Sequence, residues 1–110
     1  MKLYEIILII NPFLKENKIF KIINLLEKYI LHKKGLILYK NFWGLKKFQY
    51  DIKKNKNGYY FLIEIKIFPK YIINIKENIK NEENILRYLI IKLNKYAIKY
   101  LHNKRNINKY

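Results

Sequence analysis

The sequence predicts an α+β domain of the ferredoxin-like kind, in which a four-stranded antiparallel sheet carries two helices on one face. Two observations predict it. Apolar β-rich runs and helical apolar stripes follow one another in the order βαββαβ, and Asn57-Gly58 lies between the two middle runs, where it is typical of a hairpin. A chain of 110 residues is the size of one domain with a small core. We therefore expect a single domain over residues 1–94 and a basic C-terminal tail over residues 95–110.

The N-terminal third predicts a strand followed by a helix. Residues 3–10 form a β-rich apolar run, which Asn11-Pro12 closes because proline cannot donate to a sheet ladder. Over residues 15–32 apolar residues recur at spacings of three and four, the pattern of a helix with one buried face. Gly35 follows this stripe and is the expected terminating glycine.

The middle of the chain predicts a long β-hairpin. Residues 36–50 are extended in pattern, and Gly44 within them introduces a bulge or a bend. Residues 53–58 are polar and end in two residues that tolerate positive φ, so they predict the turn. Residues 59–68 return as a strand in which charged and apolar residues alternate, so one of its faces is buried.

The last elements are a shorter helix and a strand. Pro69 suits the first turn of a helix that ends near Asn81, because the missing N–H of proline costs nothing there. Residues 84–93 return to a strand pattern. Two right-handed crossovers place both helices on one side of the sheet, so its other face stays available for binding. The alternation of strand residues assigns to this open face Glu5, Tyr60, Leu62 and Glu64.

The charge of the chain implies a polyanionic partner. There are 24 Lys and Arg residues against 8 Asp and Glu, a formal net charge of +16. The vocabulary of Ile, Lys, Asn, Tyr, Leu and Glu is what AT-rich codons produce, so part of the lysine excess is mutational drift. A nucleic acid nevertheless fits a basic chain of this size better than an anionic membrane surface does.

The residue inventory argues against an enzyme. Without Ser, Thr or Cys the chain has no hydroxyl or thiol nucleophile of the usual kinds, no disulfide and no thiolate metal site. His32 lies at a predicted helix end, where a favourable interaction with the helix dipole is the ordinary explanation, and His102 lies in the tail, so neither is expected to be catalytic. We expect no metal, no cofactor and no small-molecule substrate. The apolar residues 3–10 are too few to span a membrane, and no membrane association is expected.

Basic residues interleaved with aromatic ones are the remaining chemistry. Lysines attract phosphates, while tyrosines and Trp43 offer flat faces to bases or to a protein. Most of the eleven tyrosines are expected in the core or at its rim, and Trp43 could equally cap the edge of the core. Arg87 could fork to a phosphate on the open face or form a salt bridge with Glu5 on a neighbouring strand.

Four segments in this order and spacing resemble the bacterial small-subunit ribosomal protein S6 family over roughly residues 2–93. The segments are Leu3 to Pro12 with its Tyr-Glu and Asn-Pro, Trp43 to Lys53 with its glycine, basic pair and aromatic residues, Gly58-Tyr59, and Arg87-Tyr88 through Lys92. Two departures stand out. Asp51 occupies a place where the family usually has proline, and the tail is basic rather than acidic.

The resemblance implies a structural constituent of the small ribosomal subunit, with a ferredoxin-like fold and no enzymatic activity. It implies binding to the central domain of small-subunit ribosomal RNA together with ribosomal protein S18, in the ribosome of an AT-rich bacterium or of an organelle. By matching position, the implied RNA contacts are Lys2, Tyr4, Arg87 and Lys92. Further contacts, to the partner protein or to RNA, are expected at Trp43, Lys46, Lys47, Lys95, Tyr96, Tyr100 and Arg105.

Two other classes share the strand order. An RNA-recognition-motif domain that binds single-stranded RNA is the main alternative, because residues 58–63 faintly resemble its aromatic third-strand motif. The predicted first strand, however, lacks the paired aromatic residue of such domains. A small hydrolase of acylphosphatase shape would need an anion-cradling loop after the first strand, and Asn11-Pro12-Phe13 is no such loop.

Overall fold

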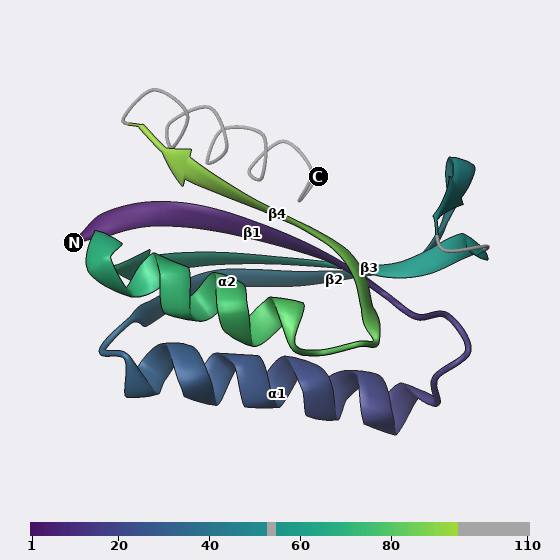
Figure 1. Cartoon of the computed structure of the whole chain (residues 1–110), viewed down its shortest axis with the longest axis horizontal. Helices are drawn as coiled ribbons and strands as arrows, with labels where there is room; N and C mark the ends of the chain where they lie inside the picture. Colours follow the sequence, from purple (N-terminus) through teal and green to yellow (C-terminus); the bar gives the residue numbers. More distant parts are fainter. Residues whose placement is uncertain (53–54, 95–110) are drawn as a thin grey trace, which may run out of the picture.

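The fold is a four-stranded sheet with two helices against one face, as a computed structural model shows it (Figure 1). The structure describes residues 1–52 and 55–94, with side chains described outside residues 46–57. The elements are β1 (Lys2–Ile10), α1 (Glu16–His32), β2 (Leu36–Ile52), β3 (Asn55–Ile67), the short 3₁₀ helix η1 (Pro69–Tyr71), α2 (Ile72–Lys80) and β4 (Ile85–Leu93). The strand order is β2-β3-β1-β4 with antiparallel neighbours throughout. The predicted ferredoxin-like class is confirmed.

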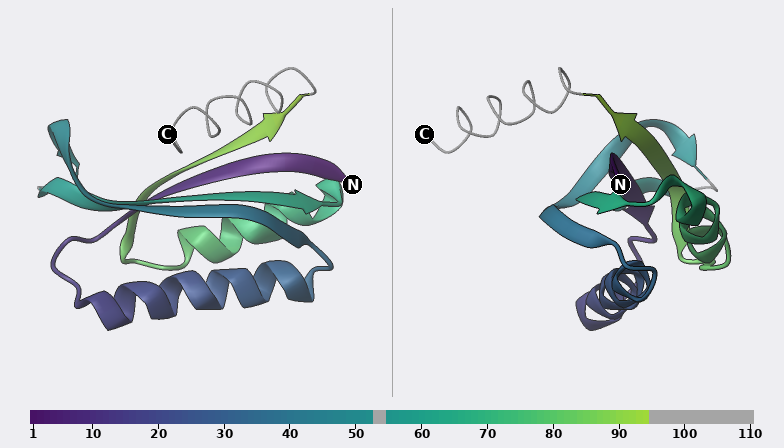
Figure 2. Two further views of the ribbon diagram at one scale, coloured as in Figure 1. Left: turned by 180° about the vertical axis from the view of Figure 1, so that it is seen from behind. Right: turned by 90° about the vertical axis from the view of Figure 1, so that its left-hand side faces the viewer.

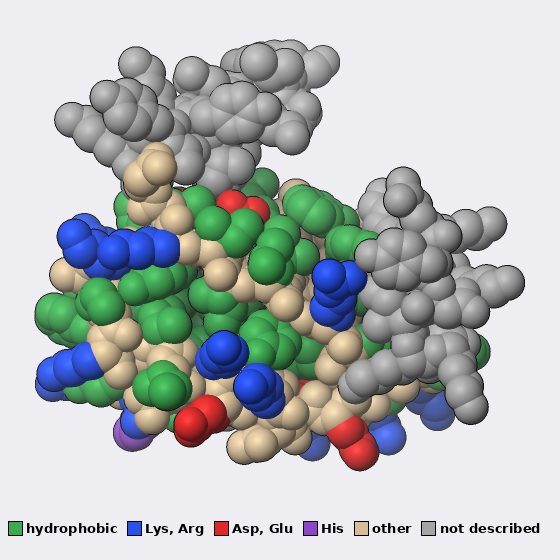
Figure 3. All heavy atoms as spheres, turned by 45° about the horizontal axis from the view of Figure 1, so that its top comes forward, with side chains coloured by type: hydrophobic (Ala, Val, Ile, Leu, Met, Phe, Trp, Pro, Cys, Tyr) green, Lys and Arg blue, Asp and Glu red, His purple; other side chains and the backbone are tan. Residues whose placement is uncertain are grey.

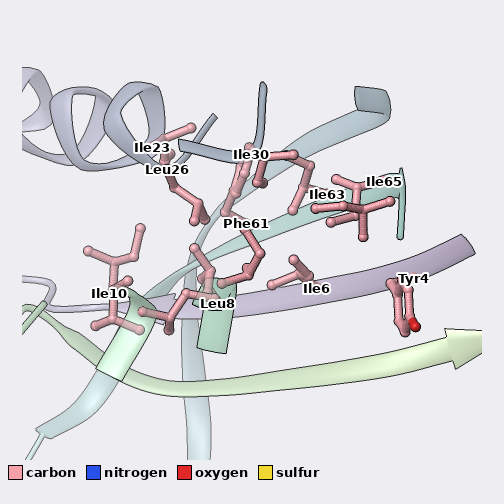
Figure 4. Packing of buried hydrophobic residues seen from close by; sticks show 14 of the residues in the cluster. Tyr4, Ile6, Leu8, Ile10, Ile23, Leu26, Ile30, Phe61, Ile63 and Ile65 are labelled. Atoms are coloured by element: carbon pink, nitrogen blue, oxygen red, sulfur yellow. The ribbon is translucent and has the colours of Figure 1, made fainter. Parts of the chain in front are cut away.

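The two central strands supply most of the core. β1 pairs with β3 over its full length, from Lys2 opposite Ile67 to Ile10 opposite Tyr59. Alternate residues of both strands face the helices and are buried, and Figure 4 shows several of them packed against α1. The side chains with less than 2% exposure are Ile6, Leu8, Ile10, Ile19, Ile30, Ile63, Ile65, Ile67, Ile75 and Ile79. Branched aliphatic side chains suit this role because they fit a pleated surface and pack with few rotamers.

The stripe predicted over residues 15–32 is the buried face of α1. Ile19, Ile23, Leu26 and Ile30 point into the core, and Glu16 in the first turn favours the positive end of the helix dipole. The helix is held to the sheet on its solvent side as well, where the Lys40 ammonium of β2 donates to Glu27 Oε1 at 3.1 Å. This ion pair is partly exposed, so it adds little to stability.

Gly35 ends α1 by a different mechanism from the one expected. The residue with positive φ is Lys34 (φ 64°), and the Gly35 N–H then donates to the Ile30 carbonyl at 2.9 Å. A Cβ on Gly35 would stand 2.8 Å from Ile30 Cγ2 and 3.2 Å from Ile67 Cδ1. Glycine is therefore required here for close packing between the helix end and β3, while a lysine takes the left-handed conformation.

The bulge predicted at Gly44 is confirmed. The register of β2 against β3 shifts between Phe42 and Gly44, and Gly44 has a φ of 82°. Phe42 before the bulge faces the helices, where its ring lies 5.3 Å from that of Phe20. The bulge thus keeps an aromatic residue on the core side while the strand continues past the end of the sheet.

The hairpin is longer than predicted, and Asn57-Gly58 is not its turn. β2 continues to Ile52 and β3 begins at Asn55, so Asn57 and Gly58 are strand residues paired with Lys47 and Lys46. The prediction was wrong because continuous strand pairing competed successfully with the turn preference of these two residues. The paired strands project beyond the helices, as Figure 1 and the left view of Figure 2 show.

The second helical segment starts at Pro69, as expected, with one 3₁₀ turn that leads directly into α2. α2 ends at Lys80, one residue before the expected end, and packs through Ile75 and Ile79. The tail over residues 95–110, with its predicted contacts, lies outside the described residues.

Replacing Gly44 by alanine is expected to cost about 1–2 kcal/mol of unfolding free energy, because an L-residue with a side chain disfavours the left-handed region. No atom lies within 4 Å of the added Cβ, so the loss comes from the backbone alone. Gly44→Asn is the matched control and should lose less, since asparagine tolerates this conformation. Urea unfolding measures both variants, and an alanine variant as stable as the original would show that the bulge does not need the glycine.

Candidate nucleic-acid interface

Lysines gather at one end of the molecule. This end is the left one in Figure 1. At it lie the starts of β1 and β2, the ends of β3 and β4, the C-terminus of α1 and the turn η1. The lysines of this basic end are Lys2, Lys33, Lys34, Lys66, Lys70 and Lys92. In the part of the chain that the structure describes, no acidic residue lies within two residues of this end of any strand or helix.

Acidic residues mark the opposite end of the helices. Glu16 begins α1, and Glu82 and Glu83 follow α2, so all three lie far from the basic end. The separation matters because charges more than a Debye length apart, about 10 Å at 0.1 M salt, are largely screened from each other. Lys2, Lys33, Lys34, Lys70 and Lys92 therefore keep their attraction for an external polyanion, whereas Lys66 has Glu64 two residues away on the same face of β3.

Lys2 and Lys92, two of the predicted RNA contacts, belong to this basic end. Lys92 is opposite Tyr4 in the pairing of β1 with β4, and both lysines are exposed. Tyr4 itself is only 6% exposed and lies in the core cluster, as Figure 4 shows. Its ring thus belongs to the core, and little of its surface remains for a ligand.

Arg87 lies apart from the other three. It is opposite Ile9 of β1, at the other end of β4 and on the face away from the helices. Beside it is a hollow of about 200 Å³ lined by Ile7, Ile9, Arg87, Tyr88 and Leu89. The suggested salt bridge with Glu5 is wrong, because Glu5 is opposite Ile91, four residues or about 13 Å further along the strand.

The open face of the sheet is mainly apolar. On it lie Ile7 and, exposed by about half, Leu89 (52%) and Ile91 (40%) of the edge strand β4. Figure 3 shows a face of the molecule on which hydrophobic side chains occupy a broad central area with Lys and Arg mainly around it. The predicted residues Glu5, Tyr60, Leu62 and Glu64 are all on the open face. Glu5 and Glu64 are directly opposite each other in its middle, and Glu64 is 2% exposed.

Trp43 lies on the open face rather than at the edge of the core. Its ring stacks on that of Tyr60, with centroids 6.2 Å apart and an interplanar angle of 23°. It is 41% exposed, so a large flat surface remains available to a partner. Phe42, its neighbour, takes the core position that Trp43 could have taken. The side chains of Lys46 and Lys47 are outside the described part of the chain.

The sequence reasoning missed four residues of the basic end, namely Lys33, Lys34, Lys66 and Lys70. Each lies within two residues of the end of a predicted element. In a βαββαβ fold the end of the first helix, the end of the third strand and the start of the second helix all reach the side where the first strand begins. Assigning each lysine near the end of a predicted element to one end of this fold would have found them.

The geometry of the described residues gives no support to a catalytic or metal-binding function. Within residues 1–52 and 55–94 no three His, Cys, Asp or Glu side chains are grouped so that they could hold a metal ion. His32 is the last residue of α1, as predicted, where a cationic or polar side chain favours the helix dipole. No helix in the described ranges is long and apolar enough to cross a membrane.

Fold and charge together define a class, a small basic ferredoxin-like domain that presents lysines at one end and an apolar sheet face beside them. The chain belongs to the ribosomal protein S6 family, whose family model matches residues 3–92. It is accordingly a component of the small ribosomal subunit, in a family of structural, non-enzymatic proteins, and associates with ribosomal RNA as part of that subunit.

Similar proteins cover nearly the whole chain. The small ribosomal subunit protein bS6 of Christiangramia forsetii is 34% identical over 109 residues, covering 99% of this chain and 97% of the relative. That of Flavobacterium psychrophilum is 31% identical over 105 residues, covering 96% and 93%. The crystal structure of 30S ribosomal protein S6 from Thermotoga maritima superimposes with a TM-score of 0.83 at 23% identity, over 96% of this chain and 97% of that one, which shows the shared fold.

Salt is expected to stabilise the free protein. A net charge of +16 opposes compaction, and the Debye length falls from about 10 Å at 0.1 M to about 3 Å at 1 M salt. Urea midpoints measured at these two NaCl concentrations should therefore rise with salt. The urea midpoint of a Lys33→Gln/Lys70→Gln variant should rise less with salt, because two of the mutually repelling charges at the basic end are removed. Coinciding midpoints for the unaltered protein would show that self-repulsion is unimportant.

Proposed function

We propose that this protein is a structural constituent of the bacterial small ribosomal subunit that binds the central domain of small-subunit ribosomal RNA together with ribosomal protein S18. The observation that carries the proposal is the basic end, where Lys2 and Lys92 meet lysines from α1, β3 and η1. A bacterial rather than an organellar ribosome is favoured because the similar proteins from Christiangramia forsetii and Flavobacterium psychrophilum are bacterial.

RNA is expected at the basic end because its lysines form a phosphate-attracting surface. Exposed ammonium groups bind phosphate oxygens as point charges and release condensed counterions, which supplies affinity without sequence specificity. Lys2 and Lys92 are exposed on neighbouring strands, so one stretch of RNA backbone can contact both. Arg87, on the open face near the opposite end of β4, would contact a separate part of the assembly.

A protein partner is expected on the open face. Leu89 and Ile91 expose apolar surface there, next to Ile7 of β1. Contiguous exposed apolar surface is typical of protein interaction sites. Glu5 and Glu64 in the middle of the same face add no positive charge that would attract phosphates, which favours a polypeptide over RNA at this position.

The RNA-recognition-motif alternative draws support from one feature, the stacked pair of Trp43 and Tyr60 on the open face. Domains of that class stack bases on aromatic residues of both central strands. Here the open-face residues of β1 next to Tyr60 and Leu62 are Ile9 and Ile7, which offer no ring. Dependence of RNA binding on ribosomal protein S18 separates the two functions.

Binding to a central-domain fragment of small-subunit ribosomal RNA should be tight with ribosomal protein S18 present and weaker without it, in a gel-shift assay. Lys2→Gln/Lys92→Gln should reduce the magnitude of the negative slope of log affinity against log salt by about two, one for each phosphate that is no longer neutralised. Lys18→Gln/Lys21→Gln, two exposed lysines at the far end of α1, is the matched control and should change the slope little. Equal affinity for any single-stranded RNA, indifferent to S18, would favour the alternative instead.

Removing apolar surface from the open face should weaken binding of the protein partner but not of the RNA. In Leu89→Gln/Ile91→Gln the effect of S18 on RNA affinity is expected to fall at least tenfold, while RNA binding in its absence stays unchanged. The control Leu25→Gln/Leu31→Gln alters side chains of α1 with similar exposure, 54% each. Titration of labelled S18 measures the direct interaction. If both double variants bind S18 as the unaltered protein does, the partner surface lies elsewhere.

A further inference from the structure

We propose that Lys33, Lys34 and Lys70 form a phosphate-binding corner, a second contact for the ribosomal RNA backbone that extends the interface from the sheet edge onto the end of α1. The inference rests on the RNA-binding function proposed above. It adds a site that the family motifs do not imply, because none of these three residues belongs to the matching segments. Lys33 and Lys34 follow α1 directly, and Lys70 is the middle residue of η1.

Two ammonium groups of the corner converge on one ring. Lys33 Nζ lies 5.8 Å from the centroid of the Tyr71 ring, and Lys70 Nζ lies 5.1 Å from the same centroid. Lys33 Nζ is also 5.6 Å from the ring centroid of Tyr29. Two lysines from segments 37 residues apart in the sequence are thus held around a single tyrosine.

The rings fix these ammonium groups in place. Tyr29 and Tyr71 are partly buried and pack against the core cluster, so their positions are those of the rigid fold. The attraction between a cation and the ring face then holds each lysine near its ring. A ligand that binds both ammonium groups consequently loses less side-chain freedom than it would on mobile lysines.

The helix dipole does not explain the position of Lys70. Cations after the C-terminus of α1 favour its dipole, which accounts for Lys33 and Lys34. Lys70, in contrast, lies at the start of a helical segment that has no acidic residue in its first turn, and a cation is disfavoured there. Within the part of the chain that the structure describes, none of the three corner lysines forms an ion pair with a carboxylate, so the positive charge of the corner is not compensated there.

The backbone of Lys34 supplies an independent observation. Its φ of 64° is in the left-handed region, which costs free energy for a residue with a long side chain. Asparagine adopts this conformation more easily, and the chain uses asparagine in many other places. Lysine in place of asparagine keeps a positive charge here at the cost of backbone strain, and this charge favours the α1 dipole and is available to a phosphate as well.

The chemistry of the corner fits phosphodiester groups rather than bases. Ammonium groups act as point charges toward phosphate oxygens, and they occupy the vicinity of the Tyr29 and Tyr71 rings that a base would otherwise stack on. The interaction is therefore expected to depend on salt and to be insensitive to nucleotide sequence.

The test uses the full chain with ribosomal protein S18 and a central-domain ribosomal RNA fragment as probe, over a series of salt concentrations. Lys33→Gln/Lys70→Gln is expected to reduce the magnitude of the negative slope of log affinity against log salt by about two. The matched control is Lys18→Gln/Lys80→Gln, which also removes one lysine from each helical segment but at the opposite end, and it should leave the slope unchanged. Thermal melting confirms that all variants are folded.

A single substitution separates charge from structure. Lys34→Asn relieves backbone strain but loses a favourable interaction with the α1 dipole, so the melting temperature should change little, while the magnitude of the salt slope should fall by about one. A purely structural role for Lys34 would change the stability without changing the slope.

Chemical acetylation of assembled small subunits offers a second measurement. Lys33 and Lys70 should be protected from the reagent because RNA covers them, while Lys18 should be modified.

Two results would overturn the proposal. One is an unchanged slope in Lys33→Gln/Lys70→Gln while Lys2→Gln/Lys92→Gln reduces its magnitude, which would confine RNA to the sheet edge. The other is an equal decrease in the magnitude of the slope in the Lys18→Gln/Lys80→Gln control, which would show that any two lysines contribute equally and that the corner is not a specific site. If the unaltered protein fails to bind the fragment, the proposed function fails instead.

Discussion

The pairing of β1 with β3 is the constraint on which the rest of the structure depends. Nine consecutive pairs hold these two strands together, and alternate residues of both are buried under the helices. A fully buried isoleucine contributes about 1.5–3 kcal/mol, and a slip by one residue would turn every such side chain to the open face. The register is therefore fixed by burial, and with it the position of each charged residue on the same two strands.

That register separates the charges of the sheet along the strand axis. Because Ile6 and Ile63 must face the helices, their neighbours Glu5 and Glu64 are forced onto the open face, opposite each other. Lys2 and Lys66, at the strand ends, project where the core has ended. The same packing requirement thus places two carboxylates in the middle of the open face and Lys66 at its border, while Lys2 lies at the end of the side that faces the helices. Gly35 completes the arrangement, since its lack of a Cβ lets the C-terminus of α1 approach β3 closely.

Elements were predictable from the sequence wherever local pattern and burial agree. The stripe from Ile19 to Ile30 has the period of a helix, and the same residues are buried in α1. The bulge at Gly44 and the helix start at Pro69 follow from backbone preferences that no tertiary contact opposes. Failures occurred where a distant contact decided the outcome. Asn57 and Gly58 are part of β3 because they pair with β2. The close approach of Gly35 to Ile67 joins residues far apart in the sequence, so no local pattern indicates it.

The candidate interface was harder to predict for the same physical reason. Lys33 and Lys70 do not stand out in the sequence, because each lies among many other lysines and the excess itself reflects codon bias as well as function. Their meeting around Tyr71 depends on the three-dimensional position of η1 against the end of α1. Total charge predicts that a polyanion binds, whereas its location follows from which lysines the core brings to one end and which acidic residues it keeps away. In this protein Glu16, Glu82 and Glu83 lie at the far end of the helices, and Glu5 and Glu64 lie on the open face, so the attraction for phosphate is strongest where the lysines follow α1 and lie in η1.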